Sequence, residues 1–282
     1  MIKSLKDTYT LNNGVKIPGL GLGVWQVDTP QECINAVKAA VKNGYISIDT
    51  AKAYDNEEYV GQAIKECDKK REELFITSKL WNADQGYDNT LKAFDATLKR
   101  LDMEYLDMYL IHWPVPVADK YVETWKAMEK LNKEGLIRAI GVSNFTKAHL
   151  QRLADECEII PAVNQIEYHP WLIQPALNAY MEENNIKLEA WSPLAHGELL
   201  NNEIIGKIAE KYNKSIAQVI IKWDLQNGVI TIPKSVKEER IIANADVFDF
   251  ELSVEDMATI NGMNKDYRTG PDPDEFDMDA AK

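Results

Sequence analysis

The sequence LFITSKLWNADQGYDNTLKAFDATLKRLDMEYLDMYLI, residues 74–111, predicts one strand–helix–strand unit. Short apolar runs at Leu74–Ser78 and Tyr105–Ile111 begin and end it. Between them, apolar residues recur three or four positions apart, as on one face of an α-helix: Leu91, Phe94, Leu98 and Leu101. Strands this short and apolar are typical of a parallel sheet that is buried on both faces.

The same alternation extends over most of the chain. The predicted strands are Gly19–Gly23, Ser47–Asp49, Leu74–Ser78, Tyr105–Ile111, Ile137–Val142, Ala162–Ile166, Leu188–Trp191 and Val229–Ile232. The predicted helices lie near residues 30–43, 56–69, 88–101, 121–134, 146–156, 174–184 and 215–227. Strands and helices that alternate in this way over roughly 250 residues favour a closed barrel over an open doubly wound sheet.

The fold class that we predict is α/β, a single-domain (β/α)8 TIM barrel spanning residues 1–282. An N-terminal β-hairpin precedes it, because Asn12-Asn13-Gly14 separates the short runs Tyr9–Leu11 and Val15–Ile17. The tail, from about residue 263 to 282, is acidic toward its end, and we expect it to be solvated or loosely packed and to contact the rim of the barrel.

A Rossmann domain is the main alternative for a chain with this alternation. Gly19, Gly21 and Gly23 resemble the start of the GxGxxG fingerprint, but Gln26 stands where the pattern needs its last glycine. Tight packing of a strand and turn is the better explanation of these glycines.

Composition excludes several classes of function. A net charge of -13 argues against nucleic acid as a partner, which requires clustered Lys and Arg. No apolar stretch is long enough to span a bilayer, and the N-terminal residues lack the apolar region of a secretory signal. The cysteines, Cys33, Cys67 and Cys157, are isolated and odd in number, so we expect a reduced, cytoplasmic protein. The sequence has no obvious interface stripe, so a monomer is the default expectation.

Four ionisable side chains come together at the carboxyl ends of the predicted strands, where barrel enzymes carry their sites. Asp49, Lys79 and His112 each follow or end a strand, and Tyr54 lies in the loop after Asp49. Each has an ordinary explanation when taken alone: a loop cap, an exposed lysine, a core histidine or a packed tyrosine. Their predicted convergence at one rim favours a catalytic role.

The sequence resembles the aldo-keto reductase superfamily. Within it, the sequence is similar to the bacterial-type branch, which includes enzymes like diketogluconate reductase and prostaglandin F synthase. The resemblance runs from about residue 8 to 262, in colinear order. Its motifs are Ile48-Asp49-Thr50-Ala51 with Tyr54, ITSKLW (76–81), DMYLIHWP (107–114), IGVSNF (140–145), NQIEYHP (164–170), WSPLA (191–195) and IPKSV (232–236).

The resemblance implies an NADP-dependent oxidoreductase of the carbonyl reductase or alcohol dehydrogenase type, which reduces aldehydes and ketones by hydride transfer. Tyr54 would be the general acid, assisted by Lys79, Asp49 and His112. A protonated Lys79 about 4 Å from Tyr54 would favour tyrosinate by roughly 4 kcal/mol, or about three pKa units. Burial opposes this effect, so we expect a smaller net lowering of the tyrosine pKa.

The resemblance also implies residues that bind NADPH or NADP+. These are Trp25, Asp49, Ser143, Asn144, Gln165, Trp191, Ser192, Leu194, Lys234, Ser235, Val236, Arg240 and Asn244. Lys234, Ser235 and Arg240 would hold the adenosine 2′-phosphate, which favours NADPH over NADH because a phosphate prefers cations. A solvated helix start is the ordinary explanation of this last group.

A small carbonyl compound would bind among the indoles at the barrel mouth. The expected substrate residues are Trp25, Tyr54, Trp81, His112 and Trp113. The other indoles considered, at Trp125, Trp171 and Trp223, are expected in the core. Two rival interpretations remain open: a metal-dependent barrel hydrolase, although the four histidines lack HxH or HExxH spacing, and a non-catalytic module that binds NADPH.

Overall fold

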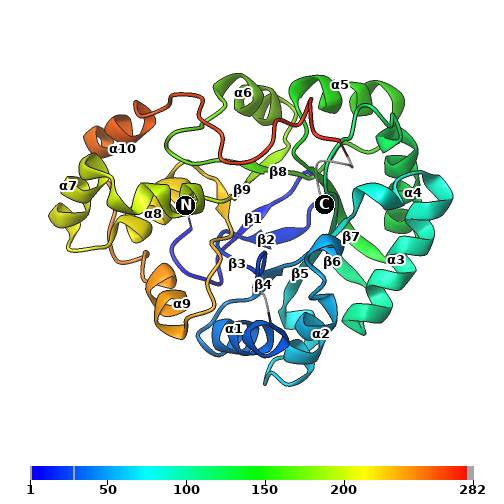
Figure 1. Ribbon diagram of the computed structural model, residues 1–282, viewed down its shortest axis with the longest axis horizontal. Coiled ribbons are helices and arrows are strands. Elements are labelled where there is room, and N and C mark those ends of the chain that lie inside the picture. Colours follow the sequence, from blue (N-terminus) through cyan, green and yellow to red (C-terminus); the bar gives the residue numbers. More distant parts are fainter. Residues whose placement is uncertain (1, 28, 278–282) are drawn as a thin grey trace.

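The computed structural model describes residues 2–27 and 29–277, and its centre is a parallel sheet of eight strands. Each strand pairs with the next one along the chain, from β3 to β10. Their bounds are β3 Leu22–Gly23, β4 Ser47–Asp49, β5 Phe75–Leu80, β6 Leu106–Ile111, β7 Ile137–Ser143, β8 Val163–Glu167, β9 Lys187–Trp191 and β10 Ile230–Thr231. Helices surround the strands on the outside (Figure 1).

The first and last strands meet and close the sheet into a barrel. Parallel bridges join Leu20 to Thr231 and Gly23 to Lys234. Two main-chain hydrogen bonds accompany them: Gly21 N donates to Thr231 O at 3.0 Å, and Thr231 N donates to Gly19 O at 3.1 Å. The predicted (β/α)8 barrel is confirmed, and we call the contact between residues 19–23 and 230–234 the seam.

In the described part of the chain, the α-helices include all seven that the sequence predicts and three more. The helices are α1 Pro30–Lys42, α2 Glu57–Lys65, α3 Tyr87–Leu101, α4 Tyr121–Lys133, α5 Lys147–Glu156, α6 Pro175–Glu183, α7 Glu203–Tyr212, α8 Ile216–Gln226, α9 Glu238–Ala245 and α10 Val254–Asn261. The sequence analysis missed α7, α9 and α10. It allowed one helix for each connection, whereas α7 shares a connection with α8, and α9 and α10 both follow β10.

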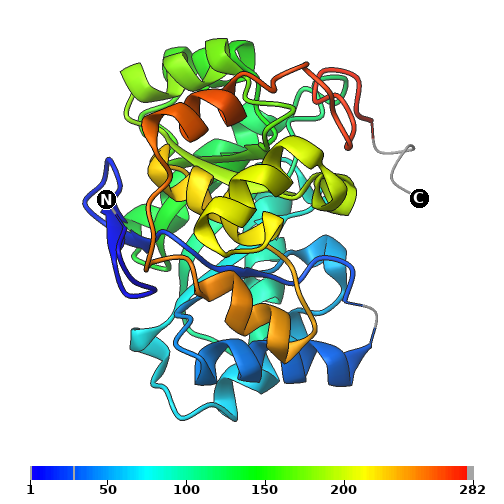
Figure 2. The ribbon, with the colours of Figure 1, turned by 90° about the vertical axis from the view of Figure 1, so that its left-hand side faces the viewer.

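The N-terminal hairpin is also confirmed, and it closes the end of the barrel that lies away from the strands' carboxyl ends. It consists of β1 Thr8–Thr10 and β2 Lys16–Pro18, with Gly14 at a φ of 84° in the turn. Leu11 and Ile17 pack with residues of the barrel interior such as Met108. Figure 2 shows the hairpin on the left side of the molecule and the tail, as far as residue 277, on the right side.

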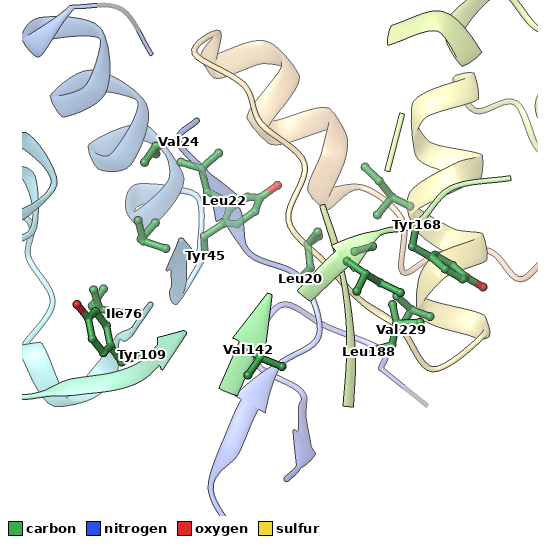
Figure 3. Packing of buried hydrophobic residues seen from close by; sticks show 14 of the residues in the cluster. Leu20, Leu22, Val24, Tyr45, Ile76, Tyr109, Val142, Tyr168, Leu188 and Val229 are labelled. Carbon is green, nitrogen blue, oxygen red and sulfur yellow. The ribbon is translucent and has the colours of Figure 1, made fainter. Parts of the chain in front are cut away.

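The main hydrophobic core lies between the sheet and its helices. Figure 3 shows outward-facing strand residues such as Leu22, Ile76 and Val142 in this layer. Trp125 of α4 and Trp223 of α8 are fully buried in it, as expected, whereas Trp171 is only half-buried. Because apolar packing occupies the outer face of the strands, polar side chains at the strand ends are left to face the barrel axis.

Candidate active site

A cavity of about 700 Å³ opens at the carboxyl ends of the strands. Most of the site residues expected from the sequence line it: Trp25, Asp49, Tyr54, Trp81, His112, Trp113, Ser143, Asn144, Gln165, Trp191, Ser192 and Lys234. Lys79 lies just beneath the lining, in contact with Tyr54. Leu194, Ser235, Val236, Arg240 and Asn244 do not line this cavity.

A buried ion pair supports the hydroxyl of Tyr54 from below. The Lys79 ammonium donates to Asp49 Oδ1 at 2.5 Å, to the Thr50 carbonyl at 3.0 Å and to the Tyr54 hydroxyl oxygen at 3.2 Å. Lys79 and Asp49 are both almost completely buried. Tyr54 ends the short 3-10 helix Lys52–Tyr54, which brings its ring over strands β4 and β5. The structure thus brings Asp49, Tyr54 and Lys79 together at this rim.

Electrostatics keep the lysine charged and the tyrosine neutral. Burial lowers the pKa of Lys79, but Asp49 and Tyr54 more than offset this and raise it to about 12. For Tyr54, burial is the largest influence and raises the pKa, Lys79 lowers it, and Asp49 raises it again, so that the net pKa is higher than usual. The expected net lowering was thus wrong in sign, because burial and two neighbouring carboxyl groups, Asp49 and Glu189, together exceed the effect of the ammonium.

His112 faces the same part of the cavity as a neutral imidazole. Burial, and to a smaller extent the charge of Lys79, hold its pKa well below the usual value. Its ring contacts the rings of Tyr54 and Trp81 edge to face, with centroid distances of 5.7 and 5.3 Å. A neutral imidazole keeps one N–H that can donate to a carbonyl oxygen bound beside Tyr54.

A polar network joins the ends of β7, β8 and β9. Trp191 Nε1 donates to Asn144 Oδ1 at 2.8 Å, and Asn144 Nδ2 donates to Ser143 Oγ at 3.1 Å. Ser143 Oγ donates in turn to the Gln165 carbonyl at 2.8 Å. The side-chain nitrogen of Gln165 donates to Asp49 Oδ2 at 2.8 Å and to Glu189 Oε2 at 3.0 Å. Together these bonds hold the indole of Trp191 at the wall of the cavity.

The tail forms part of the cavity wall, which corrects the expectation of a loosely packed end. Thr269, Gly270 and Pro271 line the cavity, and Phe276 stacks on Trp113 with a centroid distance of 4.3 Å. Backbone N–H groups of Thr269 and Gly270 donate to the buried Glu167 carboxylate at 2.6 and 3.1 Å. The predicted contact with the rim is confirmed through residue 277, and residues 278–282 lie outside the described part.

Cationic residues follow β10. Lys234 borders the cavity, Ser235 is buried, and Arg240 is exposed on α9. Within residues 2–27 and 29–277, neither Lys234 nor Arg240 forms an ion pair, although acidic side chains outnumber basic ones. Val236 is half-buried and Asn244 is buried on the inner side of α9. The side chains of Lys234 and Arg240 can therefore bind an anionic group of a ligand that extends out of the cavity beyond Lys234.

Sequence reasoning missed two residues of the site. Glu189 belongs to the polar network, and His196 lines the cavity. His196 lies between Trp25 and Trp191, with ring centroids 5.3 and 6.4 Å away. Glu189 could have been noticed as a single acid inside the apolar strand LEAW, but His196 lies in an irregular segment that no periodic pattern predicts.

Metal-ligand clusters and membrane-spanning helices are not found among the described residues. In the described ranges, 2–27 and 29–277, no group of three His, Cys, Asp or Glu side chains is arranged to hold a metal ion. None of the helices in the same ranges has the length and apolar character to cross a membrane.

Comparison with known proteins gives consistent matches along the chain. The profile described as "Aldo/keto reductase family" matches residues 19–265. A glyoxal reductase of Bacillus subtilis is 61% identical over 276 residues, which cover 98% of this chain and 99% of that protein. Methylglyoxal reductase DkgA of Escherichia coli is 48% identical over 268 residues, 94% of this chain and 96% of that protein. The crystal structure of the Gox0644 D53A mutant in complex with NADPH superposes with a TM-score of 0.92 at 47% identity, and covers 96% of this chain and 98% of its own.

Proposed function

The chain belongs to the aldo/keto reductase family, and from this premise we propose that it reduces small aldehydes and ketones to alcohols with NADPH. The observation that carries the proposal is the Tyr54 hydroxyl at the cavity surface, hydrogen-bonded at 3.2 Å to a lysine that is fully buried and paired with Asp49. The NADPH-bound relative supports the choice of cofactor.

The residues that line the cavity fit the nicotinamide end of a nicotinamide adenine dinucleotide phosphate. Gln165 Oε1 accepts no hydrogen bond within the described residues, so it is free to accept from a carboxamide. The indole of Trp191 borders the cavity and can stack on a planar ring. Ser143, Asn144 and Gln165 would hold the carboxamide, with Trp25, Asp49, Ser192 and Leu194 around the nicotinamide end.

The other end of the cofactor would lie along the residues after β10. Lys234, Ser235, Val236, Arg240 and Asn244 would bind the adenosine 2′-phosphate and its neighbours. Arg240 is suited to this role because its exposed guanidinium has no ion-pair partner in the described structure and can bind phosphate with two parallel hydrogen bonds.

Bound NADPH supplies the hydride that reduces the carbonyl carbon. The substrate oxygen would lie between the Tyr54 hydroxyl and the neutral imidazole of His112, whose rings are in contact, and the imidazole would orient it. As negative charge develops on this oxygen, Tyr54 donates its proton, and the Lys79 ammonium stabilises the forming tyrosinate. Asp49 keeps Lys79 charged and directed at the tyrosine. The raised pKa of Tyr54 ensures that the proton is present before the reaction begins.

The shape and chemistry of the cavity suit small, planar carbonyl compounds. Trp25, Trp81 and Trp113 line it, and Phe276 closes one side by stacking on Trp113. Two of the relatives, the glyoxal reductase and the methylglyoxal reductase, act by their names on small dicarbonyl compounds. We therefore place 2-oxoaldehydes such as methylglyoxal first among the substrates. NADPH oxidation across a panel of 2-oxoaldehydes, simple aldehydes, ketosugars and quinones tests this order.

Replacing Tyr54 with phenylalanine tests the proposed acid. The variant keeps the ring and its contact with His112 but removes the proton donor, so turnover should fall about 100-fold or more while NADPH affinity stays close to that of the wild type. Turnover equal to that of the wild type would remove Tyr54 from the mechanism.

Replacing Arg240 with alanine tests the cofactor assignment. The Michaelis constant for NADPH should rise by about ten-fold or more, and that for NADH should change little, because only NADPH carries the 2′-phosphate. Equal effects on the two cofactors would mean that the phosphate is held elsewhere.

The finer cellular assignments are also proposals. Cys33, Cys67 and Cys157 are free thiols, which supports a reducing compartment and thus the cytoplasm. We propose a monomeric single-domain protein with residues 263–282 as its tail. Size-exclusion chromatography with light scattering measures the oligomeric state directly.

A further inference from the structure

Glu189 is a buried carboxyl group of the site that the proposed mechanism does not use. It lies on β9, two residues before Trp191, and only 1% of its surface is exposed. Its Oε2 accepts a hydrogen bond from Gln165 Nε2 at 3.0 Å. The same nitrogen donates to Asp49 Oδ2 at 2.8 Å, so one amide group joins two carboxyl groups that come from opposite parts of the sheet.

This arrangement determines which end of the Gln165 amide faces the cavity. A primary amide has two N–H donors, and an ionised carboxylate can only accept. Since both donors of Gln165 point to carboxylates, its oxygen must point away from them, toward the cavity. With Asp49 as its only acceptor, the amide would have a free N–H and a weaker preference for this orientation.

We propose that Glu189 is a positioning residue of the cofactor site, which fixes the Gln165 amide so that its oxygen is presented to the nicotinamide carboxamide. The inference rests on the proposed function in one respect, namely that a carboxamide binds there. It adds a residue that touches neither cofactor nor substrate and acts only through Gln165.

The surroundings of Glu189 indicate that its buried carboxyl group lowers the stability of the folded protein. The charged and titratable groups around it are Asp49, Lys79 and Tyr54, and the lysine is already paired with Asp49. Burial, and next the charge of Asp49, raise the pKa of Glu189 to about 7. Replacing a buried, poorly compensated carboxyl group by an apolar residue of similar size is often neutral or stabilising. A positioning role therefore predicts that affinity and stability change in opposite directions.

The experiment compares three variants: E189L, which removes the acceptor, E189Q, which keeps an oxygen able to accept from Gln165, and E129Q as a control. Glu129 is a buried acid on α4 that accepts from the backbone of residues 158 and 159, far from the cavity. NADPH affinity is measured by titration calorimetry, the melting temperature by scanning calorimetry, and kcat at saturating NADPH.

E189L should bind NADPH about ten-fold more weakly, the loss expected for one poorly oriented hydrogen bond, with an equal or higher melting temperature. E189Q should stay within about three-fold of the wild type in affinity, and kcat should change less than affinity in both variants. E129Q keeps an oxygen that can accept from the backbone of residues 158 and 159, and it should keep the wild-type affinity. Wild-type affinity in E189L, or an equal loss in E189Q and E189L, would overturn the inference.

A second measurement separates this inference from the proposed function. In apoprotein labelled with 15N-glutamine, the Gln165 side-chain signals, identified by their loss in a Gln165→Leu variant, should respond to pH near 7. This response should be absent in E189Q. If the wild type binds no NADPH, the proposed function fails, and the amide signals alone test whether Glu189 orients Gln165. If these signals do not change when Glu189 is replaced, the inference about Glu189 is refuted.

Discussion

Replacing Lys79 with methionine tests the central electrostatic contact of the site. The ammonium lies 3.2 Å from the Tyr54 hydroxyl oxygen, and both partners of the Lys79–Asp49 ion pair are buried. Unit charges at this distance interact by about 5 kcal/mol at an effective dielectric constant of about 20. If proton transfer from Tyr54 is about half complete in the transition state, about half of this energy is lost in the variant, which corresponds to a roughly 100-fold lower rate.

The assay is single-turnover oxidation of NADPH, followed by its absorbance with methylglyoxal in excess. NADPH affinity, measured separately, should stay near the wild-type value because Lys79 lies beneath the cavity lining. Lys222→Met is the matched control, since Lys222 is a similarly buried lysine on α8 that lies outside the cavity lining. If K79M reacts as fast as the wild type across the pH range, the tyrosine does not depend on the ammonium and the mechanism fails.

Three further predictions concern stability and specificity. Burial raises the pKa of Asp224 well above its usual value, so its proton stabilises the folded state at low pH and this contribution is lost as pH rises through the folded-state pKa. Asp224→Asn should therefore be more stable than the wild type by about 1–3 kcal/mol at neutral pH and equal to it near pH 4, as measured by urea unfolding; parallel pH profiles would contradict this. Phe276→Ala removes the stack on Trp113, and should raise kcat/KM for bulky aldehydes relative to methylglyoxal; an unchanged ratio would exclude the tail from specificity. Gly61→Ala places a Cβ directly against the Leu101 carbonyl oxygen, and should cost about 1–3 kcal/mol in the same unfolding assay; wild-type stability would mean that α2 can move away from α3.

Much of the fold could be predicted because each strand–helix unit carries its own periodic signal. Residues 74–111 are the clearest case, with β5, α3 and β6 within two residues of the predicted bounds. Helix α7 was missed although Ile205, Ile208 and Ala209 are spaced for a buried helical face. The reason is that a regular template with one helix for each connection leaves no place for it.

Part of the candidate site could be predicted, because the carboxyl ends of parallel strands all lie at the same end of a barrel. This rule predicts that Asp49, Lys79 and His112 lie together. It could not give the sign of the Tyr54 pKa shift, because that depends on burial and on charges that reach it from other strands. Glu189 stands out in the sequence only as a single acid in the strand LEAW. Its importance comes from the hydrogen bond to Gln165, its partner on the neighbouring strand β8, and sequence spacing does not give this register.

The seam has a consequence for how the chain reaches this structure. Its two edges, residues 19–23 and 230–234, come from almost opposite ends of the sequence. Until the ribosome has synthesised the second edge, the N-terminal edge has unpaired N–H and C=O groups, as does the most recently added strand. The nascent protein therefore has an extended period in which these open edges can pair with other chains, and we expect chaperones that shield exposed strands to improve its yield.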